Sequence, residues 1–365
     1  MQYLGHPSEP YMRTIRRIQH LALVVLVLSL CLASTVSAGA PEALSWLRGQ
    51  QAPDGGFGQP SSVGATIDAA LAITAGGGDL TSWQMGGNTP LDFLRSNLSQ
   101  IEGAGVTAKL MLALVPAGLD PTNFGGANLA KVLEDSYDSA TGQFDGENGT
   151  VPTQALAIMA LESIGRPVEK KAINWLVDAQ ADDGSWSWNG DPATQGDTNT
   201  TAISIQALVA VNARPDVVDG ALEYLKRVQN EDAGWPYQKP SDFGTDMDAN
   251  STANVLQALY ATGADLSDWS VDSTSPLDTL LSLQKGNGAF QWQATVPDDN
   301  FLATVQAVPA LVGKAFPLTV LSGSVVAPNK LPATGGQAAP WPAVLFTLAA
   351  LTMVLAGVLR RRLMA

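Results

Sequence analysis

The chain has 365 residues, of which 45% are hydrophobic and 15% are charged, and its formal net charge is −14. This length and composition fit one large domain or two small ones with a sizeable core, and they exclude global disorder. The chain contains one cysteine, Cys31, and two histidines, His6 and His20.

A secretory signal peptide is predicted over residues 1–38. Three arginines between positions 13 and 17 precede an apolar run from Leu21 to Ala33, and the small-residue site Val36-Ser37-Ala38 follows. This order is typical of a cleaved leader. The alternative is an uncleaved membrane anchor, for which the apolar run is shorter than the ~20 residues that a span requires.

Removal of residues 1–38 would leave a mature chain without cysteine or histidine, because all three of these residues precede position 39. That composition excludes disulfide frameworks, thiolate or imidazole zinc sites, cysteine nucleophiles and Ser-His-Asp triads. We predict no metal site.

The C-terminal end reads Leu331-Pro332-Ala333-Thr334-Gly335, then an uncharged stretch, then three arginines at 360–362. This arrangement resembles the cell-wall sorting signal of sortase substrates, which combines a pentapeptide, a membrane span and a basic tail. Here the order is a linker over 319–337, an uncharged transmembrane helix over 338–359 and a basic cytoplasmic tail over 360–365. The resemblance implies that a sortase-type transpeptidase cleaves after Thr334 and leaves the body anchored outside the cell. The alternative is a plain membrane tail anchor. The sorting motif is Leu331, Pro332, Ala333, Thr334 and Gly335.

Between residues 39 and 334, 33 acidic and 14 basic side chains remain, which gives a net charge of −19. Such a surface repels nucleic acid and anionic lipid headgroups, so we expect neither as a partner. No EF-hand-like loop occurs, and we interpret the acidity as extracellular solubility.

Two sequence units alternate along the body of the chain. The first unit is a helix that ends in glutamine, followed six residues later by an aromatic residue. A weaker copy has Asp138 in the glutamine position, and a degenerate copy near 98–103 brings the total to six. The clear copies pair Gln51 with Phe57, Gln180 with Trp186, Gln229 with Trp235 and Gln284 with Phe290.

The second unit is an apolar helix with a polar start, clearest at 197–202 and 248–253. Asp, Asn, Ser and Thr are the preferred residues for helix N-caps. The helices expected after these starts, Ala202–Val211 and Ala253–Ala261, are apolar nearly all round and are therefore predicted to be buried on every side. Fainter copies start at Thr66, Thr107, Thr153 and Asp299.

The helices of the first unit, such as those expected over Val168–Gln180 and Val217–Gln229, carry charges on one face and are predicted to face solvent. Six outer and six inner helices predict an all-α protein with a single α6/α6 toroid over residues 39–318. A helix pair of this kind cannot bury its own apolar face, and closure of the ring removes the exposed ends. An open solenoid is the alternative.

Residues 180–186 read Q-x-x-x-G-x-W. This pattern resembles the QW repeat of squalene and oxidosqualene cyclases and of prenyltransferases. The other copies differ, with Phe57 and Phe290 in place of tryptophan and Ala233 in place of glycine. The resemblance implies the terpenoid cyclase and prenyltransferase toroid. It also implies a structural role for the repeat, in which glutamine staples an outer helix and the aromatic ring stacks on the next turn.

Residues 304–314, TVQAVPALVGK, resemble the closing helix of the α-domain of cobalamin carriers such as transcobalamin and intrinsic factor. This resemblance implies a corrinoid ligand. Those carriers enclose the corrinoid with a small C-terminal β-domain, whereas only a short segment separates Leu318 from Leu331 here.

Three enzymatic alternatives follow from the same fold family. The zinc site of protein prenyltransferases needs Cys and His, which the mature chain lacks. The pairs Asp182-Asp183 and Asp298-Asp299 lack the further acid of the magnesium motif of class I terpene synthases. Outside that family, paired-carboxylate glycosidases and lyases with α/α toroids also stay open, because a sequence does not give the carboxylate separation.

The third alternative is a class II terpene cyclase or mutase, which protonates its substrate through a D-x-D-D motif. Asp246-Met247-Asp248-Ala249 keeps two of the three acids at the start of an inner helix. Asp246 and Asp248 are therefore the alternative catalytic residues. A helix cap at Asp248 is the simpler interpretation.

Our leading hypothesis is a non-catalytic binding module for a corrinoid-like or other small hydrophobic ligand. The polar starts of the inner helices are expected to converge at one mouth of the toroid, where free backbone N–H groups and polar side chains meet. A structural or adhesive surface protein is a further alternative, and simple helix capping is another explanation of the same residues. The predicted ligand-binding residues are Asp68, Gln154, Asp197, Asn199, Thr200, Asp248, Asn250, Asp299 and Asn300.

Overall fold

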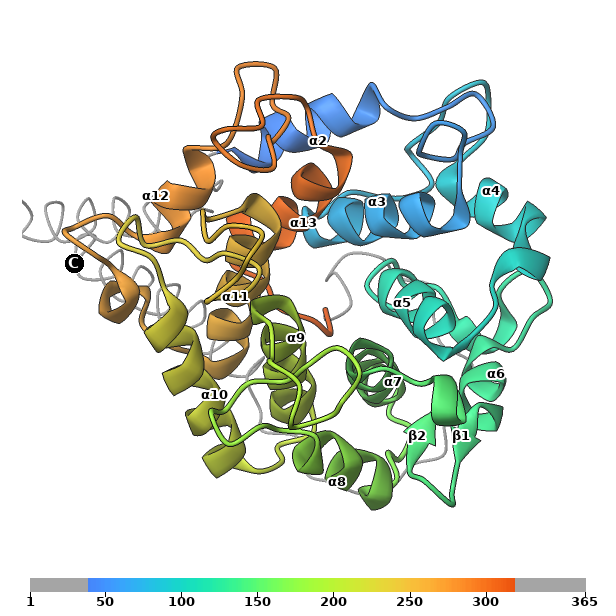
Figure 1. The fold of residues 1–365 in the computed structure, drawn as a ribbon. Coiled ribbons are helices and arrows are strands. Elements are labelled where there is room, and N and C mark those ends of the chain that lie inside the picture. Colours follow the sequence, from blue (N-terminus) through green and yellow to red (C-terminus); the bar gives the residue numbers. More distant parts are fainter. Residues whose placement is uncertain (1–38, 319–365) are drawn as a thin grey trace, which may run out of the picture. The chain divides into compact units, whose positions relative to one another are not determined.

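The computed structural model describes residues 39–318, which are predominantly helical (Figure 1). The predicted signal peptide, sorting motif, transmembrane helix and basic tail lie outside the described residues. Among the residues that are described, no helix is both long enough and apolar enough to cross a membrane.

The described chain contains twelve α-helices that alternate between an outer and an inner layer. The outer helices are α2 (Ala40–Arg48), α4 (Pro90–Ser96), α6 (Leu129–Asp135), α8 (Lys170–Asp178), α10 (Pro215–Val228) and α12 (Pro276–Leu281). The inner helices are α3 (Val63–Ala75), α5 (Ala104–Leu114), α7 (Val151–Ser163), α9 (Thr198–Ala210), α11 (Ala249–Thr262) and α13 (Phe301–Leu311). Short 3-10 helices are η1 (Leu98–Gln100), η2 (Pro121–Asn123), η3 (Gly146–Asn148) and η4 (Leu266–Trp269), and strands β1 (Tyr137–Asp138) and β2 (Gln143–Phe144) pair antiparallel.

The inner helices form a closed ring (Figure 1). Each inner helix packs against the next one along the chain, and the last, α13, packs against both α3 and α2. The predicted toroid is therefore confirmed, and the alternative of an open solenoid is wrong. Most residues of each inner helix are buried, as expected for helices that are apolar on all faces.

The predicted helix bounds need correction at several ends. Helices α9 and α11 begin four residues before the expected Ala202 and Ala253, because Asp197 and Asp248 act as their N-caps. The carboxylate of Asp197 accepts a hydrogen bond from the backbone N–H of Thr200 at 2.8 Å. The polar residues that follow each cap therefore belong to the first helical turn.

The outer-helix ends also differ from the expected ones. Helix α8 covers 170–178 instead of 168–180, and α10 starts at Pro215 instead of Val217. Proline is tolerated in the first helical position because its missing N–H has no acceptor there.

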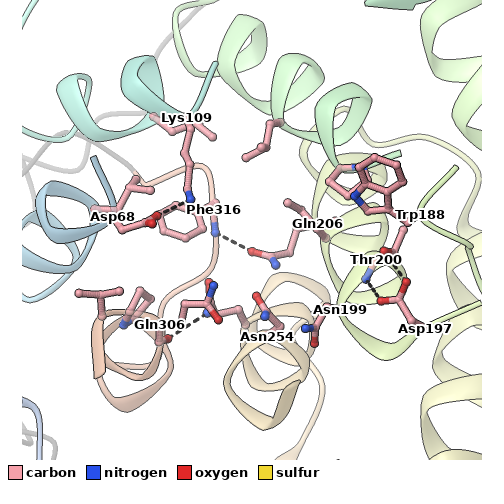
Figure 2. A pocket seen from close by; sticks show the side chains of 18 of the residues that line it. Asp68, Lys109, Trp188, Asp197, Asn199, Thr200, Gln206, Asn254, Gln306 and Phe316 are labelled. Atoms are coloured by element: carbon pink, nitrogen blue, oxygen red, sulfur yellow. Dashed lines mark hydrogen bonds and ion pairs between the residues drawn. The ribbon is translucent and has the colours of Figure 1, made fainter. Parts of the chain in front are cut away.

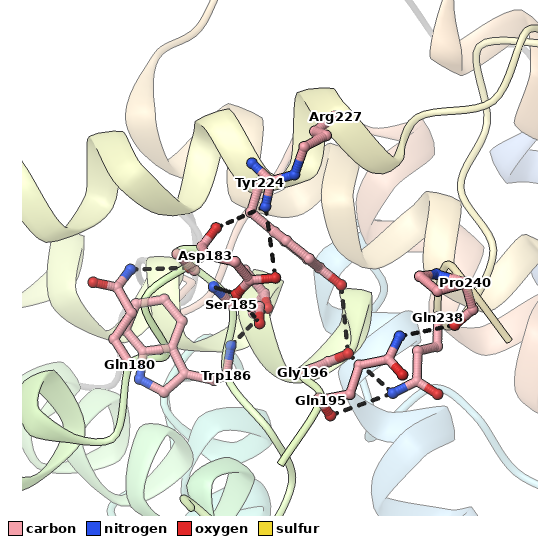
Figure 3. Close-up of polar contacts among 12 residues, drawn as sticks. Gln180, Asp183, Ser185, Trp186, Gln195, Gly196, Tyr224, Arg227, Gln238 and Pro240 are labelled. Carbon is pink, nitrogen blue, oxygen red and sulfur yellow. Dashed lines mark hydrogen bonds and ion pairs between the residues drawn. The ribbon is translucent and has the colours of Figure 1, made fainter. Parts of the chain in front are cut away.

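The glutamine of each clear repeat joins two outer elements (Figure 3). The Nε2 group of Gln180 donates to the carbonyl of Gly184 at 3.0 Å and to that of Val217, in the next outer helix, at 2.9 Å. The expected staple thus connects one outer helix to its neighbour. Gln51, Gln229 and Gln284 make the same two kinds of bond, to the carbonyls of Gly55 and Trp83, Ala233 and Trp269, and Gly288 and Gly39.

The aromatic residue of each repeat fills the space between the two layers. Trp186 is fully buried, its Nε1 donates to the carbonyl of Leu176 in α8 at 2.7 Å, and its backbone N–H donates to Oγ1 of Thr201 in α9 at 3.1 Å. The aromatic side chain therefore links an outer helix to the following inner helix. The backbone N–H groups of Phe57, Trp235 and Phe290 bond in the same way to Thr66, Thr252 and Thr304.

The repeat that has Asp138 in place of glutamine is completed by another residue. The Oε1 atom of Gln154 in α7 accepts from the backbone N–H of Phe144 at 3.0 Å. Its Nε2 donates to the carbonyls of Gly142 at 3.0 Å and of Ala172 in α8 at 2.8 Å. One buried amide thus replaces both the glutamine and the threonine of the other repeats.

The ring closes through Gln284, whose Nε2 lies 2.7 Å from the carbonyl oxygen of Gly39 at the start of α2. Replacing Gln284 with alanine removes this bond and the bond to Gly288. We expect the free energy of unfolding to fall by about 1–3 kcal/mol, as measured by urea denaturation. The matched control is Gln100→Ala, since Gln100 is exposed and its side chain bonds only Asn97.

The control substitution is expected to change stability by less than about 0.5 kcal/mol. Equal effects of the two substitutions would show that the bond between Gln284 and Gly39 contributes no more than an ordinary surface contact.

Candidate functional site

All six inner helices begin at the same end of the ring, which we call the N-terminal mouth. The rings of Phe57 and Phe301, at the starts of α3 and α13, lie 6.3 Å apart. Asp145, just before α7, accepts a hydrogen bond from the N–H of Ala104 at the start of α5. The loops before α9, α11 and α13 each contact the start of the preceding inner helix through one backbone hydrogen bond. The carbonyl of Trp188 accepts from the N–H of Val151 in α7, that of Tyr237 from Thr198 in α9, and that of Trp292 from Ala249 in α11.

A pocket of about 350 Å³ lies at the centre of the ring (Figure 2), and all six inner helices contribute to its wall. Two aromatic residues, Trp188 and Tyr237, come from loops of the N-terminal mouth. The residues that line the pocket are Asp68, Leu71, Lys109, Leu112, Pro152, Leu156, Trp188, Asp197, Asn199, Thr200, Ile203, Gln206, Tyr237, Asn254, Gln257, Val305, Gln306, Pro309 and Phe316.

Five side-chain amides dominate the polar part of the lining. Asn254 donates to the carbonyl of Asn250 at 2.9 Å, and Gln306 accepts from Nδ2 of Asn250 at 2.8 Å. Within the described part of the chain, the buried Oδ1 of Asn199 has no hydrogen-bond partner. The amides thus retain hydrogen-bonding capacity toward the pocket. The five are Asn199, Gln206, Asn254, Gln257 and Gln306.

The charged groups of the lining are already engaged. Lys109 of α5 forms an ion pair with Asp68 of α3. Asp197 is 3% exposed, and its two carboxylate oxygens accept from the backbone N–H of Thr200 at 2.8 Å and from its hydroxyl at 2.7 Å. The pocket therefore presents no unpaired side-chain cation among the residues that line it.

Burial controls the protonation of two of these lining groups. It raises the pKa of the Asp197 carboxyl above its ordinary value, although the hydrogen bonds from Thr200 oppose this shift. Burial, together with the nearby Asp197 carboxylate, raises the pKa of Tyr237 to about 12. The phenol of Tyr237 is therefore neutral at physiological pH.

The segment that follows α13 also reaches the pocket. Phe316 lies among the lining residues, and its backbone N–H donates to Oε1 of Gln206 at 2.9 Å. Nearby, the ammonium group of Lys314 donates to the carbonyl of Ala75 at the end of α3, at 2.6 Å. These contacts hold Phe316 beside Asp68 and Lys109 (Figure 2).

The structure separates the predicted binding residues into two groups. Asp68, Asp197, Asn199 and Thr200 meet in the pocket, and Asn250 touches it through Gln306. The others make local contacts elsewhere. Gln154 is buried and bonds backbone groups between the two layers, as described above. Asp248 and Asn300 cap α11 and α13, and Asp299 pairs with Lys285 at 2.6 Å on the outer surface.

Sequence reasoning missed the amides in the middle of the inner helices and the aromatic residues at the mouth. Gln206, Gln257 and Gln306 are each followed by alanine in consecutive inner helices, and this recurrence was a signal. A second signal is the aromatic residue two positions after the repeat aromatic, at Trp188, Tyr237 and Trp292.

The two alternative catalytic acids lie away from the pocket. Asp248 is 2% exposed and caps α11 through the N–H and hydroxyl of Ser251, both at 2.8 Å. Asp246 lines a separate cavity of about 560 Å³ beside α12, together with Asp232 and Asp278. Among the described residues, no group of three or more His, Cys, Asp or Glu side chains is arranged to hold a metal ion.

The sequence matches the family described as prenyltransferase alpha-alpha toroid domain over residues 152–293 and 220–314. These two overlapping stretches lie within the helical ring and agree with its observed architecture. No curated protein matches the sequence.

The solved structures that resemble this chain differ widely from it in sequence. A protein from Actinoplanes is 16% identical, with a TM-score of 0.49 over 76% of this chain and 98% of that one. Haptocorrin in complex with Cbi is 18% identical, with a TM-score of 0.48 over 78% and 68%. Candida albicans protein geranylgeranyltransferase-I complexed with GGPP is 12% identical, with a TM-score of 0.47 over 71% and 84%. Likeness at this level carries no functional argument.

Replacing Gln154 with leucine tests whether this residue is structural. The change leaves the buried N–H of Phe144 without its acceptor and the carbonyls of Gly142 and Ala172 without their donor. We expect the free energy of unfolding to fall by about 2–4 kcal/mol in urea titrations. A loss below about 0.5 kcal/mol would argue that Gln154 is free for another role.

The pH dependence of stability tests the protonation of Asp248. Burial raises the pKa of its carboxyl in the folded state above that in the unfolded chain. The stabilising contribution of Asp248 is therefore greatest below the unfolded pKa and is lost as pH rises through the folded pKa. The melting temperature of the native protein minus that of Asp248→Asn should decrease between pH 3.5 and pH 7.

The control for this experiment has the opposite sign. The hydrogen bond from the backbone N–H of Ser267 lowers the pKa of exposed Asp265, so the corresponding difference for Asp265→Asn should increase over the same pH range. If the Asp248 difference also increases with pH, its hydrogen bonds outweigh the cost of burial.

Proposed function

We propose that this chain is a non-catalytic binding protein of the cell surface and that the central pocket is its ligand site. The observation that carries this proposal is the composition of the pocket, in which five side-chain amides from α9, α11 and α13 face one cavity together with apolar side chains. A few polar groups placed among apolar ones are typical of small-molecule sites.

The two carboxylates of the pocket argue against hydrolysis by a carboxylate pair. A glycosidase of that type needs one carboxylic acid and one carboxylate that are free to act on the substrate. Here Asp68 is held by Lys109, and both oxygens of Asp197 are used to cap α9. Release of either group would cost an ion pair or a helix cap.

The lining favours a small uncharged ligand that has both hydrogen-bonding and apolar parts. The volume of about 350 Å³ is at the lower end of the range of about 300–1,000 Å³ that is usual for ligand pockets. A corrinoid, with amide side arms around an apolar ring, has this chemistry and is our first candidate. Its side arms would enter the pocket while the ring stays at the N-terminal mouth.

The cellular location is part of the same proposal. The predicted signal peptide and sorting motif support export and attachment by a sortase-type transpeptidase, so that the ring would lie outside the cell. Ligand capture, without turnover, is the activity that we infer for this surface protein.

Titration of the full-length chain with cobinamide, cobalamin and farnesol, followed by melting temperature and absorbance, tests the proposal. We expect a saturable rise in melting temperature with at least one corrinoid. The variant Ile203→Trp places a large side chain in the pocket, because Ile203 is a partly exposed lining residue, and should weaken binding at least about tenfold.

The matched control is Val132→Trp, which adds the same side chain at an exposed position of outer helix α6 and should bind normally. A rise with farnesol alone would favour the cyclase hypothesis. Binding that is equally strong in Ile203→Trp would place the ligand site outside the pocket.

A further inference from the structure

Exposed aromatic side chains gather at one end of the ring. Four aromatic side chains are exposed among the described residues: Trp188, Tyr237, Phe243 and Trp292. All four belong to three consecutive loops of the N-terminal mouth, which precede α9, α11 and α13. We call Trp188, Tyr237 and Trp292 the aromatic arc.

The three residues of the aromatic arc occupy equivalent places in successive repeats. Each follows the buried repeat aromatic by two positions, and each backbone carbonyl accepts the first N–H of the preceding inner helix at 2.8–3.1 Å. The backbone at each ring is therefore fixed to the rigid inner layer. The three aromatic residues are thereby held at the starts of α7, α9 and α11, which are consecutive helices of the inner layer.

The loops that carry the aromatic arc are also tied to one another (Figure 3). Gln195 donates to the carbonyl of Pro240 at 2.8 Å, and Gln238 donates back to the carbonyl of Gly196 at 3.1 Å. In the next pair of loops, Gln293 donates to the carbonyl of Asp246 at 3.3 Å. Such cross-links reduce the entropy that a partner would have to remove on binding.

The charge and polarity of the mouth restrict the partner. The acidic body repels anionic polymers, and the lysine of the adjoining pocket is paired with Asp68. The adjoining pocket adds side-chain amides, among them those of Asn199 and Asn254.

An uncharged polysaccharide fits all of these features. The C–H groups on the face of a sugar ring carry partial positive charge and are attracted to the negative face of an aromatic ring. The hydroxyl groups at its edge match side-chain amides as donors and acceptors. The axes of packed neighbouring helices are about 8–10 Å apart. Three rings held at the starts of three consecutive inner helices therefore span more than a single sugar.

We propose that the aromatic arc binds a chain of uncharged sugars along the N-terminal mouth. The inference goes beyond the proposed function, because it assigns the mouth a second class of ligand besides the one held in the central pocket. Binding at three rings in series also gives avidity that a single sugar lacks.

Affinity electrophoresis tests this inference with the full-length chain in a polyoxyethylene detergent, which has no sugar headgroup that could compete. Native gels contain hydroxyethyl cellulose, galactomannan, dextran or soluble starch, and polygalacturonate serves as the anionic control. We expect at least one uncharged polysaccharide to retard the protein, whereas polygalacturonate should not.

Single substitutions Trp188→Ala, Tyr237→Ala and Trp292→Ala should each weaken retardation about three- to tenfold, and the triple variant should abolish it. Val132→Ala, which removes an exposed apolar side chain from outer helix α6, is the matched control and should migrate as the native protein does. Trp292→Phe should retain most of the binding, because it keeps an aromatic face.

The two proposals can fail separately. Ile203 lines the pocket and does not belong to the aromatic arc, so Ile203→Trp should weaken the cobinamide-induced melting shift while retardation by the polysaccharide is retained. Absence of retardation by all four uncharged polysaccharides would overturn the inference, and so would equal retardation of the native protein and the triple variant. Preferential binding to polygalacturonate would overturn it as well.

Discussion

The structure depends on one kind of hydrogen bond, in which a glutamine side-chain amide ties the turn after one outer helix to the next outer helix or to the segment that leads into it. The inner helices are apolar nearly all round, so they are fully covered only when this outer layer is continuous and the ring is closed. The bond from Gln284 to Gly39 completes that layer, because it joins the last outer repeat to the first outer helix.

Closure of the ring also determines where chemistry can occur. Inner helices packed around a common axis direct the side chains of one narrow face toward that axis, and in α9, α11 and α13 this face carries amides. Their N-terminal ends meet at the mouth, where loops add aromatic rings that the core does not need. Structural and candidate binding residues thus occupy different places. The glutamines of the repeats lie between the outer elements, and the candidate site lies at the centre of the ring.

The architecture could be predicted from the sequence because repeats, caps and apolar helices are local signals. The site was predicted only in part. Asp197 and Thr200 lie in the pocket, but the same types of residue at Asp248 and Asn300 serve as caps without reaching it. A cap and a ligand contact use the same side chains, and only the direction of the helix face distinguishes them.

Gln154 has a consequence for recognising such rings. A repeat can lose its glutamine and its threonine together if the following inner helix provides one long amide, because that side chain reaches all three backbone groups. The motif then disappears from the sequence while the geometry persists. The family match begins at residue 152, and three of the six inner helices start before it. Counting motifs therefore underestimates how many repeats complete a circle.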